Sequence, residues 1–89
     1  MIEHRTIHVH GRVQGVFFRS SACTQAKAFG IVGFVRNEPD GNVVIEAEGD
    51  PAALDEFVRW CNTGPMLAEV THVEVEDGTP KHFTKFEIR

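Results

Sequence analysis

Two short segments of this 89-residue chain carry the residue types needed to bind an anion and to position a water molecule. Gly11–Arg19 contains two glycines, ends in an arginine, and lies where a predicted strand gives way to a predicted helix. Backbone N–H groups at the start of a helix have no partner within that helix, so with a glycine-containing loop they form a concave anion site. Arg19 would add a permanently charged fork that matches phosphate oxygens.

Gly11–Arg19 matches neither of the common phosphate-binding motifs. No Gly-Lys-Ser/Thr follows, so the segment is not a Walker loop, and its glycines lack the Gly-x-Gly-x-x-Gly spacing of dinucleotide sites. The same residues also fit an ordinary strand-to-helix turn with a surface arginine. Taken alone, the segment leaves both a phosphate site and a plain turn open.

Asn37, which follows Arg36 at the end of another predicted strand, is the second candidate. Its neutral amide can accept a hydrogen bond and hold a water molecule near a bound phosphate, provided that the two strand ends approach each other. Asparagine is also common in turns, because its side chain imitates a backbone turn. A turn residue is the simpler explanation for Asn37 by itself.

Hydrophobic periodicity predicts the elements that must position these residues. Alternation with a period of two indicates half-buried strands, and apolar residues three and four apart indicate the buried face of a helix. The predicted strands cover residues 6–10, 33–37, 42–48, 71–76 and 84–89, and the predicted helices cover about 20–30 and 51–63. Ser20 or Ser21 would cap the first helix, and Gly30 would end it in a left-handed conformation. Asp50 would cap the second helix, with Pro51 in its first turn.

The predicted elements follow the order β-α-β-β-α-β, with a last short strand. Each strand is apolar on one face and polar on the other, which favours a mostly antiparallel sheet of four to five strands with two helices on one face. This order fits the ferredoxin-like split β-α-β arrangement of α+β proteins. Residues 1–89 are therefore predicted to form a single domain with one simple core.

The composition argues against several classes of function. Nine Lys and Arg residues against 13 Asp and Glu give a formal net charge of −4, so no basic stripe is available to bind nucleic acid. The predicted open face of the sheet is acidic and lacks paired aromatics for base stacking. No apolar run approaches the ~18 residues of a membrane span, and residues 1–5 do not resemble a secretory signal, which predicts a cytoplasmic protein with no membrane partner.

His8 and His10 are the best rival site, because they share one side of a predicted strand and together could ligate a metal. The simpler explanation is a solvated sheet face, so no metal site is predicted. That face would also carry Glu46, Glu48, His72 and Glu74.

Cys23 and Cys61 are too few for a disulfide framework or a cysteine-rich zinc site. Both lie on the sheet-facing sides of predicted helices, so buried thiols are favoured over a disulfide or a catalytic thiol. Phe17 and Phe18 either form an exposed hydrophobic lip or join the core, and the core is favoured for Phe18.

Taken with their surroundings, the two candidate segments resemble the signatures of the acylphosphatase family. Gly11–Arg19 is similar to the first signature, and Gly33–Asn37 is similar to the second. Family spacings are matched further along the chain by Gly41, Val43 and Gly49, and a third, weaker stretch by Trp60, Gly64-Pro65, Ala68 and Val70. The resemblance covers the chain from about Ile7 to Ile88, and two long signatures in order are far more specific than one short motif.

The resemblance implies a hydrolase that splits the carboxyl–phosphate bond of acyl phosphates into a carboxylate and inorganic phosphate. Arg19 matches the phosphate-binding arginine, and Asn37 matches the asparagine that orients the attacking water. A loop whose backbone N–H groups cradle the phosphate is matched by Gln14, Gly15, Val16, Phe17 and Phe18. Phe17 and Ser20-Ser21 depart from the residues that are frequent at their positions, but neither departure removes a catalytic group.

The resemblance further implies a monomer that takes a small acyl phosphate as its substrate and uses no metal or cofactor. Such a substrate needs no general acid, because its leaving carboxylate has a pKa of roughly 4. The alternative is a non-catalytic module that binds an anion or carbamoyl phosphate, like the acylphosphatase-like domain of a larger maturation enzyme. The single-domain length favours the free enzyme.

Overall fold

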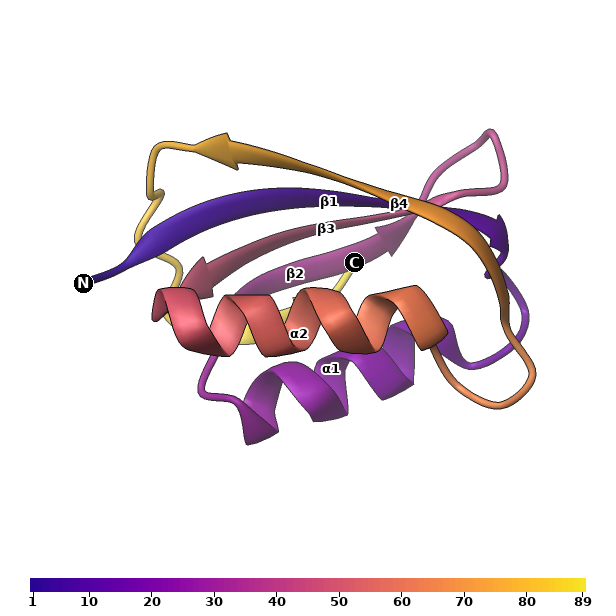
Figure 1. The fold of residues 1–89 in the computed structure, drawn as a ribbon, viewed down its shortest axis with the longest axis horizontal. Helices are drawn as coiled ribbons and strands as arrows, with labels where there is room; N and C mark the ends of the chain where they lie inside the picture. Colours follow the sequence, from indigo (N-terminus) through magenta and orange to yellow (C-terminus); the bar gives the residue numbers. More distant parts are fainter.

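The alternation of apolar and polar residues produces a five-stranded sheet with two helices against one of its faces (Figure 1). The computed structural model describes all residues from Met1 to Arg89. The elements are β1 (Glu3–Arg12), α1 (Phe18–Ala28), β2 (Val32–Asn37), β3 (Val43–Gly49), α2 (Pro51–Thr63), β4 (Glu69–Gly78) and β5 (Phe86–Ile88). The predicted ferredoxin-like α+β fold is therefore confirmed.

The strands lie in the order β4-β1-β3-β2-β5, and every neighbouring pair is antiparallel except β2 and β5. Ile7 lies opposite Ile45, and Val9 lies opposite Val43, so the apolar residues of β1 and β3 share the face that the helices cover. β3 lies between β1 and β2, and both of these strands run antiparallel to it. The C-terminal ends of β1 and β2 therefore lie at the same end of the sheet, which brings the two candidate segments to one end of the molecule.

The core lies between the sheet and the two helices. Phe18, Ala22 and Ala26 of α1 are buried, which is helical spacing on one face. The corresponding residues of α2 are Leu54, Phe57 and Cys61, whose spacing of three and four residues is the pattern that predicts the buried face of a helix. Burying such side chains supplies the main driving force for folding, at about 1.5–3 kcal/mol for each large apolar residue.

Cys61 is fully buried and Cys23 is half-buried, and both are free thiols. Burial raises the pKa of the Cys61 thiol, so it stays protonated and inert in the folded chain. Both cysteines pack with the core cluster, as predicted for structural thiols.

The start of α1 differs from its prediction. The helix begins at Phe18, before either serine, and Phe17 is its N-cap with a left-handed φ of 65° and no side-chain capping bond. The hydroxyl of Ser20 donates to the Phe17 carbonyl oxygen, 3.2 Å away, so this serine belongs to the first turn. The left-handed backbone at Phe17 turns the chain into the helix, and a serine cap is not used.

The other helix ends agree more closely with prediction. Gly30 has a φ of 71°, and the N–H of Ile31 donates to the Ala26 carbonyl at 2.8 Å, which closes α1 in the predicted left-handed manner. Pro51 opens α2 as predicted. Asp50 precedes it, but its carboxylate makes no capping bond, and only its carbonyl accepts from Leu54 N–H.

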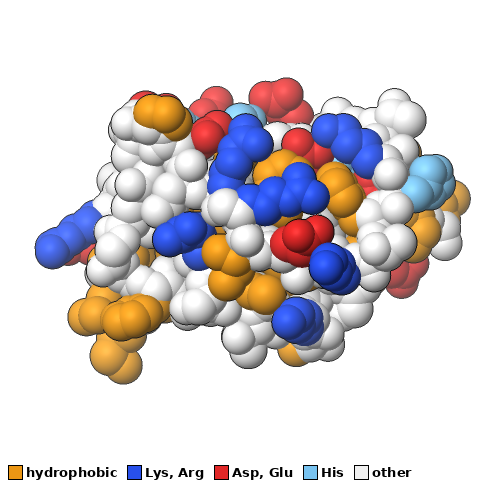
Figure 2. Space-filling view, turned by 180° about the vertical axis from the view of Figure 1, so that it is seen from behind, with side chains coloured by type: hydrophobic (Ala, Val, Ile, Leu, Met, Phe, Trp, Pro, Cys, Tyr) orange, Lys and Arg blue, Asp and Glu red, His pale blue; other side chains and the backbone are white.

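The open face of the sheet is not uniformly acidic. Phe34 and Phe83 form an edge-to-face pair there with ring centroids 5.8 Å apart. Arg89 lies over the Phe34 ring at 4.3 Å, and Phe34 is only 3% exposed, so this pair is not a pair of open rings for base stacking, as the sequence predicts. Figure 2, a view from behind, shows Lys and Arg side chains gathered around hydrophobic atoms.

No helix of the structure has the length and apolar run that a bilayer crossing requires.

Candidate active site

A hollow of about 290 Å³ lies beside the loop that joins β1 to α1. The C-terminal end of β2 forms another part of the wall of the hollow, because β1 and β2 end at the same end of the sheet. Its lining residues are Val13, Gly15, Phe17, Phe18, Arg19, Ser20, Asn37 and Ile88. Arg19 and Asn37, the two residues expected to carry the chemistry, thus line one cavity.

The loop of residues 13–17 is anchored by buried side chains, while several of its backbone N–H groups make no backbone hydrogen bond. Val13 and Val16 are buried in the core, and Phe18 follows them there as predicted. Gly15 and Phe17 have positive φ values of 74° and 65°, on either side of Val16. Such alternation turns successive N–H groups toward one concave side, which is the geometry of an anion-binding nest. None of the N–H groups of residues 15–17 donates to a backbone carbonyl.

Arg19 brings a positive charge to this cradle from the first turn of α1. Its Nη1 donates to the carbonyl oxygen of Arg89, 3.3 Å away, and this carbonyl is its only hydrogen-bond partner. A guanidinium has five N–H donors, so most of them remain available to a ligand. No Asp or Glu side chain pairs with Arg19, and the positive end of the α1 dipole adds to its field.

Asn37 is the last residue of β2 and lies opposite Val43 of β3. Its Oδ1 is buried and has no hydrogen-bond partner. Leaving a buried polar atom unpaired costs about 1–3 kcal/mol, so such atoms are rare unless they serve a ligand or a water molecule. Asn37 itself lines the same hollow as Arg19, so its amide group lies next to the place where a molecule would bind.

Gln14 braces the loop from outside the hollow. Its Nε2 donates to the carbonyl oxygens of Glu38 at 2.7 Å and Asn42 at 2.9 Å. Both acceptors belong to the turn between β2 and β3, so the side chain ties the cradle to the strand end that carries Asn37. Gln14 does not line the hollow.

The structure therefore divides the predicted substrate-binding residues into two groups. Gly15, Phe17, Phe18 and Arg19 line the hollow, whereas Gln14 and Val16 hold the loop in place. Phe17 is 72% exposed at the mouth, which makes it the hydrophobic lip that the sequence left as one of two options.

Three lining residues were not among the predicted site residues: Val13, Ser20 and Ile88. Ser20 was assigned a capping role, and Val13 lies beside the predicted loop. Ile88 reaches the site because β5 pairs in parallel with β2, where Ile88 lies opposite Val35. Local patterns contain no signal for that pairing.

Comparisons with known proteins show the family and the fold of this chain. Residues 5–88 match the family model described as Acylphosphatase. An acylphosphatase from Nocardioides sp. is 52% identical over 93% of this chain and 84% of the relative. The structure of an acylphosphatase from Coxiella burnetii superposes with a TM-score of 0.96 at 31% identity, covering 99% of this chain and 93% of that one. The crystal structure of acylphosphatase from Bacillus subtilis gives a TM-score of 0.93 at 37% identity, covering 100% and 99%. The chain belongs to the acylphosphatase family.

Proposed function

We propose that this chain hydrolyses acyl phosphates to a carboxylate and inorganic phosphate in the hollow between the β1–α1 loop and the end of β2. Arg19 and the backbone N–H groups of residues 14–18 bind the phosphoryl group, and Asn37 orients the attacking water. The observation that carries the proposal is that Asn37, whose buried Oδ1 has no hydrogen-bond partner, lines the same cavity as Arg19.

The chemistry of the substrate explains why so few groups suffice. An acyl phosphate is a mixed anhydride whose leaving group is a carboxylate with a pKa of roughly 4, so it departs without being protonated. The bond from water oxygen to phosphorus forms as the bond from phosphorus to acyl oxygen breaks. A phosphate oxygen takes the proton of the water. The protein then needs only to position the water and to stabilise charge on the phosphoryl oxygens.

The walls of the hollow suit the two halves of such a substrate. Arg19 and the free N–H groups of the loop are complementary to the phosphoryl oxygens. Val13, Phe17 and Ile88 supply apolar surface, which suits the acyl group. The volume of about 290 Å³ is at the small end of ligand pockets, so the substrate is a small molecule.

The proposal includes catalysis without a metal ion by a monomer in the cytoplasm. The lining residues include no carboxylate, which is the ligand that Mg²⁺ prefers beside a phosphate. Arg19 supplies the positive charge in its place. Two free thiols suit a reducing compartment.

The decisive experiment measures phosphate release from acetyl phosphate and benzoyl phosphate in the presence of a chelator. Arg19→Gln should lower kcat/KM by at least about 100-fold, because it removes the charge that stabilises the transition state. Asn37→Ala should lower kcat while inorganic phosphate still binds within a few-fold of its original affinity. Arg59→Gln is the matched control, since Arg59 is exposed on α2 and contacts only Glu56.

Three results would contradict the proposal. Tight phosphate binding without turnover would select the non-catalytic module that binds an anion or carbamoyl phosphate. Weakened phosphate binding with unchanged kcat in Asn37→Ala would contradict the role of Asn37. Loss of turnover in chelator would contradict metal independence.

A further inference from the structure

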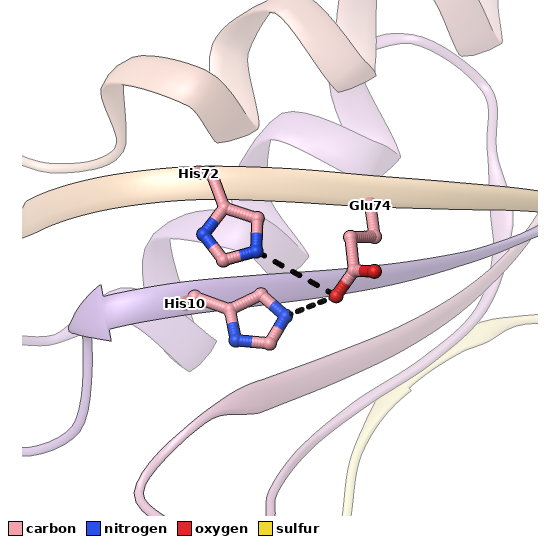
Figure 3. Close-up of side chains that lie close together, drawn as sticks. All are labelled: His10, His72 and Glu74. Carbon is pink, nitrogen blue, oxygen red and sulfur yellow. Dashed lines mark hydrogen bonds and ion pairs between the residues drawn. The ribbon is translucent and has the colours of Figure 1, made fainter.

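Three metal-ligating side chains converge on the open face of the sheet, away from the residues that line the hollow. They are His10 of β1 and His72 and Glu74 of β4, and Figure 3 shows all three pointing toward one another. The sequence suggested His8 and His10 as a metal-binding pair. The structure instead pairs His10 with a histidine of the neighbouring strand.

The donor atoms of this cluster are close enough to share one cation. The Nε2 of His10 lies 2.6 Å from Glu74 Oε1, and the Nε2 of His72 lies 3.6 Å from the same oxygen. The two imidazole rings are stacked with centroids 4.0 Å apart and planes 7° apart, so both rings must rotate about their side-chain bonds for their nitrogens to face one ion. All three ligand atoms lie within 4.8 Å of one another.

The backbone holds this arrangement, because His10 and His72 are direct partners in the antiparallel β1–β4 ladder. The register shifts between His10 and Gly11, because Thr71 of β4 has no partner on β1, which makes a bulge in β4 next to His72. Gly11 has a φ of 125°, and a Cβ there would collide with the carbonyl oxygen of Glu69. Only glycine fits this position, so the sequence itself fixes the bulge and the direction of the His10 side chain.

We propose that His10, His72 and Glu74 form a surface site for Zn²⁺. Tetrahedral zinc with bonds of about 2.0–2.1 Å places its ligand atoms roughly 3.3 Å apart, and the two separations from the Glu74 oxygen bracket that value. Two imidazole nitrogens and one carboxylate oxygen suit zinc, whereas Ca²⁺ and Mg²⁺ prefer oxygen ligands alone.

The surroundings of the cluster also suit a cation. The side chains of His10, His72 and Glu74 are 26%, 59% and 60% exposed, so an ion can enter and water can complete its coordination. The neighbouring pair along the same two strands, His8 and Glu76, lies 3.7 Å apart and adds a second carboxylate to this side of the sheet.

The bound ion would join the edge strand β4 to the sheet. Nearly all side chains of β4 are exposed, so this strand is held mainly by its ladder with β1. A ligand that bridges two strands in the native state only must stabilise that state. The site is therefore structural, and it is independent of the phosphate chemistry in the hollow.

The test is isothermal titration calorimetry of the metal-stripped full chain with Zn²⁺ alone, near pH 7.5. We expect one ion per chain, and His10→Gln or His72→Gln should each weaken binding at least tenfold. His82→Asn is the matched control, because His82 is an exposed histidine outside the cluster, and asparagine tolerates its positive φ of 59°. Circular dichroism checks that each variant is folded.

Thermal stability and amide exchange test the proposed structural role separately from the zinc affinity. Zn²⁺ at about ten times its Kd should raise Tm by about 5 °C or more, slow amide exchange in β4, and leave turnover of acetyl phosphate unchanged. Absence of binding at 100-fold molar excess of zinc, or binding that survives both histidine substitutions, would overturn the proposal.

Discussion

The guanidinium of Arg19 donates to the carbonyl oxygen of Arg89, 3.3 Å away, and so joins the first turn of α1 to the residue that follows β5. Arg89 is itself held on both sides. Its N–H donates to the Val35 carbonyl oxygen at 2.8 Å, and its guanidinium lies over the Phe34 ring. The phosphate-binding arginine of the proposed site is therefore oriented by a residue whose side chain is anchored on the opposite face of the sheet.

Arg89→Ala should impair catalysis without touching the hollow. The substitution removes the cation–π contacts with Phe34 and Phe83 and loosens the carbonyl that orients Arg19. We expect a loss of about 0.5–1 kcal/mol in unfolding free energy and a fall of about two- to tenfold in kcat/KM. Urea denaturation and steady-state kinetics measure both effects, with Arg59→Ala as the control. An unchanged kcat/KM in a destabilised variant would show that Arg19 needs no such support.

Gln14→Leu should loosen the phosphate cradle. The variant keeps the approximate volume of the side chain but removes two hydrogen bonds, so the carbonyls of Glu38 and Asn42 keep only their backbone donors, the N–H groups of Gly41 and Glu38. Stability should fall by about 1–3 kcal/mol, and KM should rise about three- to tenfold because the loop no longer holds its N–H groups in place. Gln25→Leu is the comparison, since Gln25 lies on α1 and makes no side-chain hydrogen bond. Equal KM values for the two variants would be the contrary result.

Phe17 should determine the preference for the acyl group. Its ring is 72% exposed at the mouth of the hollow, while its backbone occupies a left-handed conformation that asparagine tolerates. Phe17→Asn therefore removes the ring and keeps the loop. We expect the ratio of kcat/KM for benzoyl phosphate over acetyl phosphate to fall several-fold, because one apolar wall is worth about 1–3 kcal/mol in discrimination. A ratio that does not change would assign acyl selectivity to the other apolar walls.

The buried pair of His4 and Glu48 should make stability sensitive to acid. Burial by itself raises the pKa of Glu48, but hydrogen bonds from Lys81 N–H, His4 Nδ1 and Phe83 N–H outweigh it, so the pKa lies below its ordinary value of 4.5. His4 also lies 3.3 Å from Glu46, which pairs with the Lys81 ammonium. A carboxylate with a lowered pKa stabilises the fold above the unfolded pKa and loses that contribution as pH falls through the folded one.

Unfolding free energy should therefore decline as pH falls from about 4.5 downward, and Glu48→Gln should show a smaller decline. The variant should also lose about 1–3 kcal/mol near pH 7, because a charged acceptor of three hydrogen bonds is replaced by an amide. Urea denaturation between pH 3 and pH 7 provides the measurement. Identical slopes for the original chain and the variant would mean that other carboxylates cause the acid sensitivity.

Much of the fold could be predicted, because the spacing of apolar residues along the chain distinguishes strands from helices. The alternation of Ile7 and Val9, and the stripe of Leu54, Phe57 and Cys61, identified their elements and their buried faces. Helix boundaries are harder to predict. The predicted start of α1 at Ser20 or Ser21 is wrong, because the left-handed turn at Phe17 depends on backbone geometry, whereas the preference for serine at helix N-caps favours a later start.

The proposed catalytic pair, Arg19 and Asn37, could be named from the sequence, since their residue types and the resemblance of their segments point to phosphate chemistry. The sequence by itself thus determined the order of the elements, the family and the candidate residues. Only the tertiary structure decided that Asn37, with its buried and unpaired Oδ1, lines the same hollow as Arg19, that Ile88 completes the wall, and that His10 faces His72. Those relationships join residues far apart in the chain. They depend on which strands pair and in which register, and that choice is made by packing apolar faces across the whole sheet rather than by local sequence.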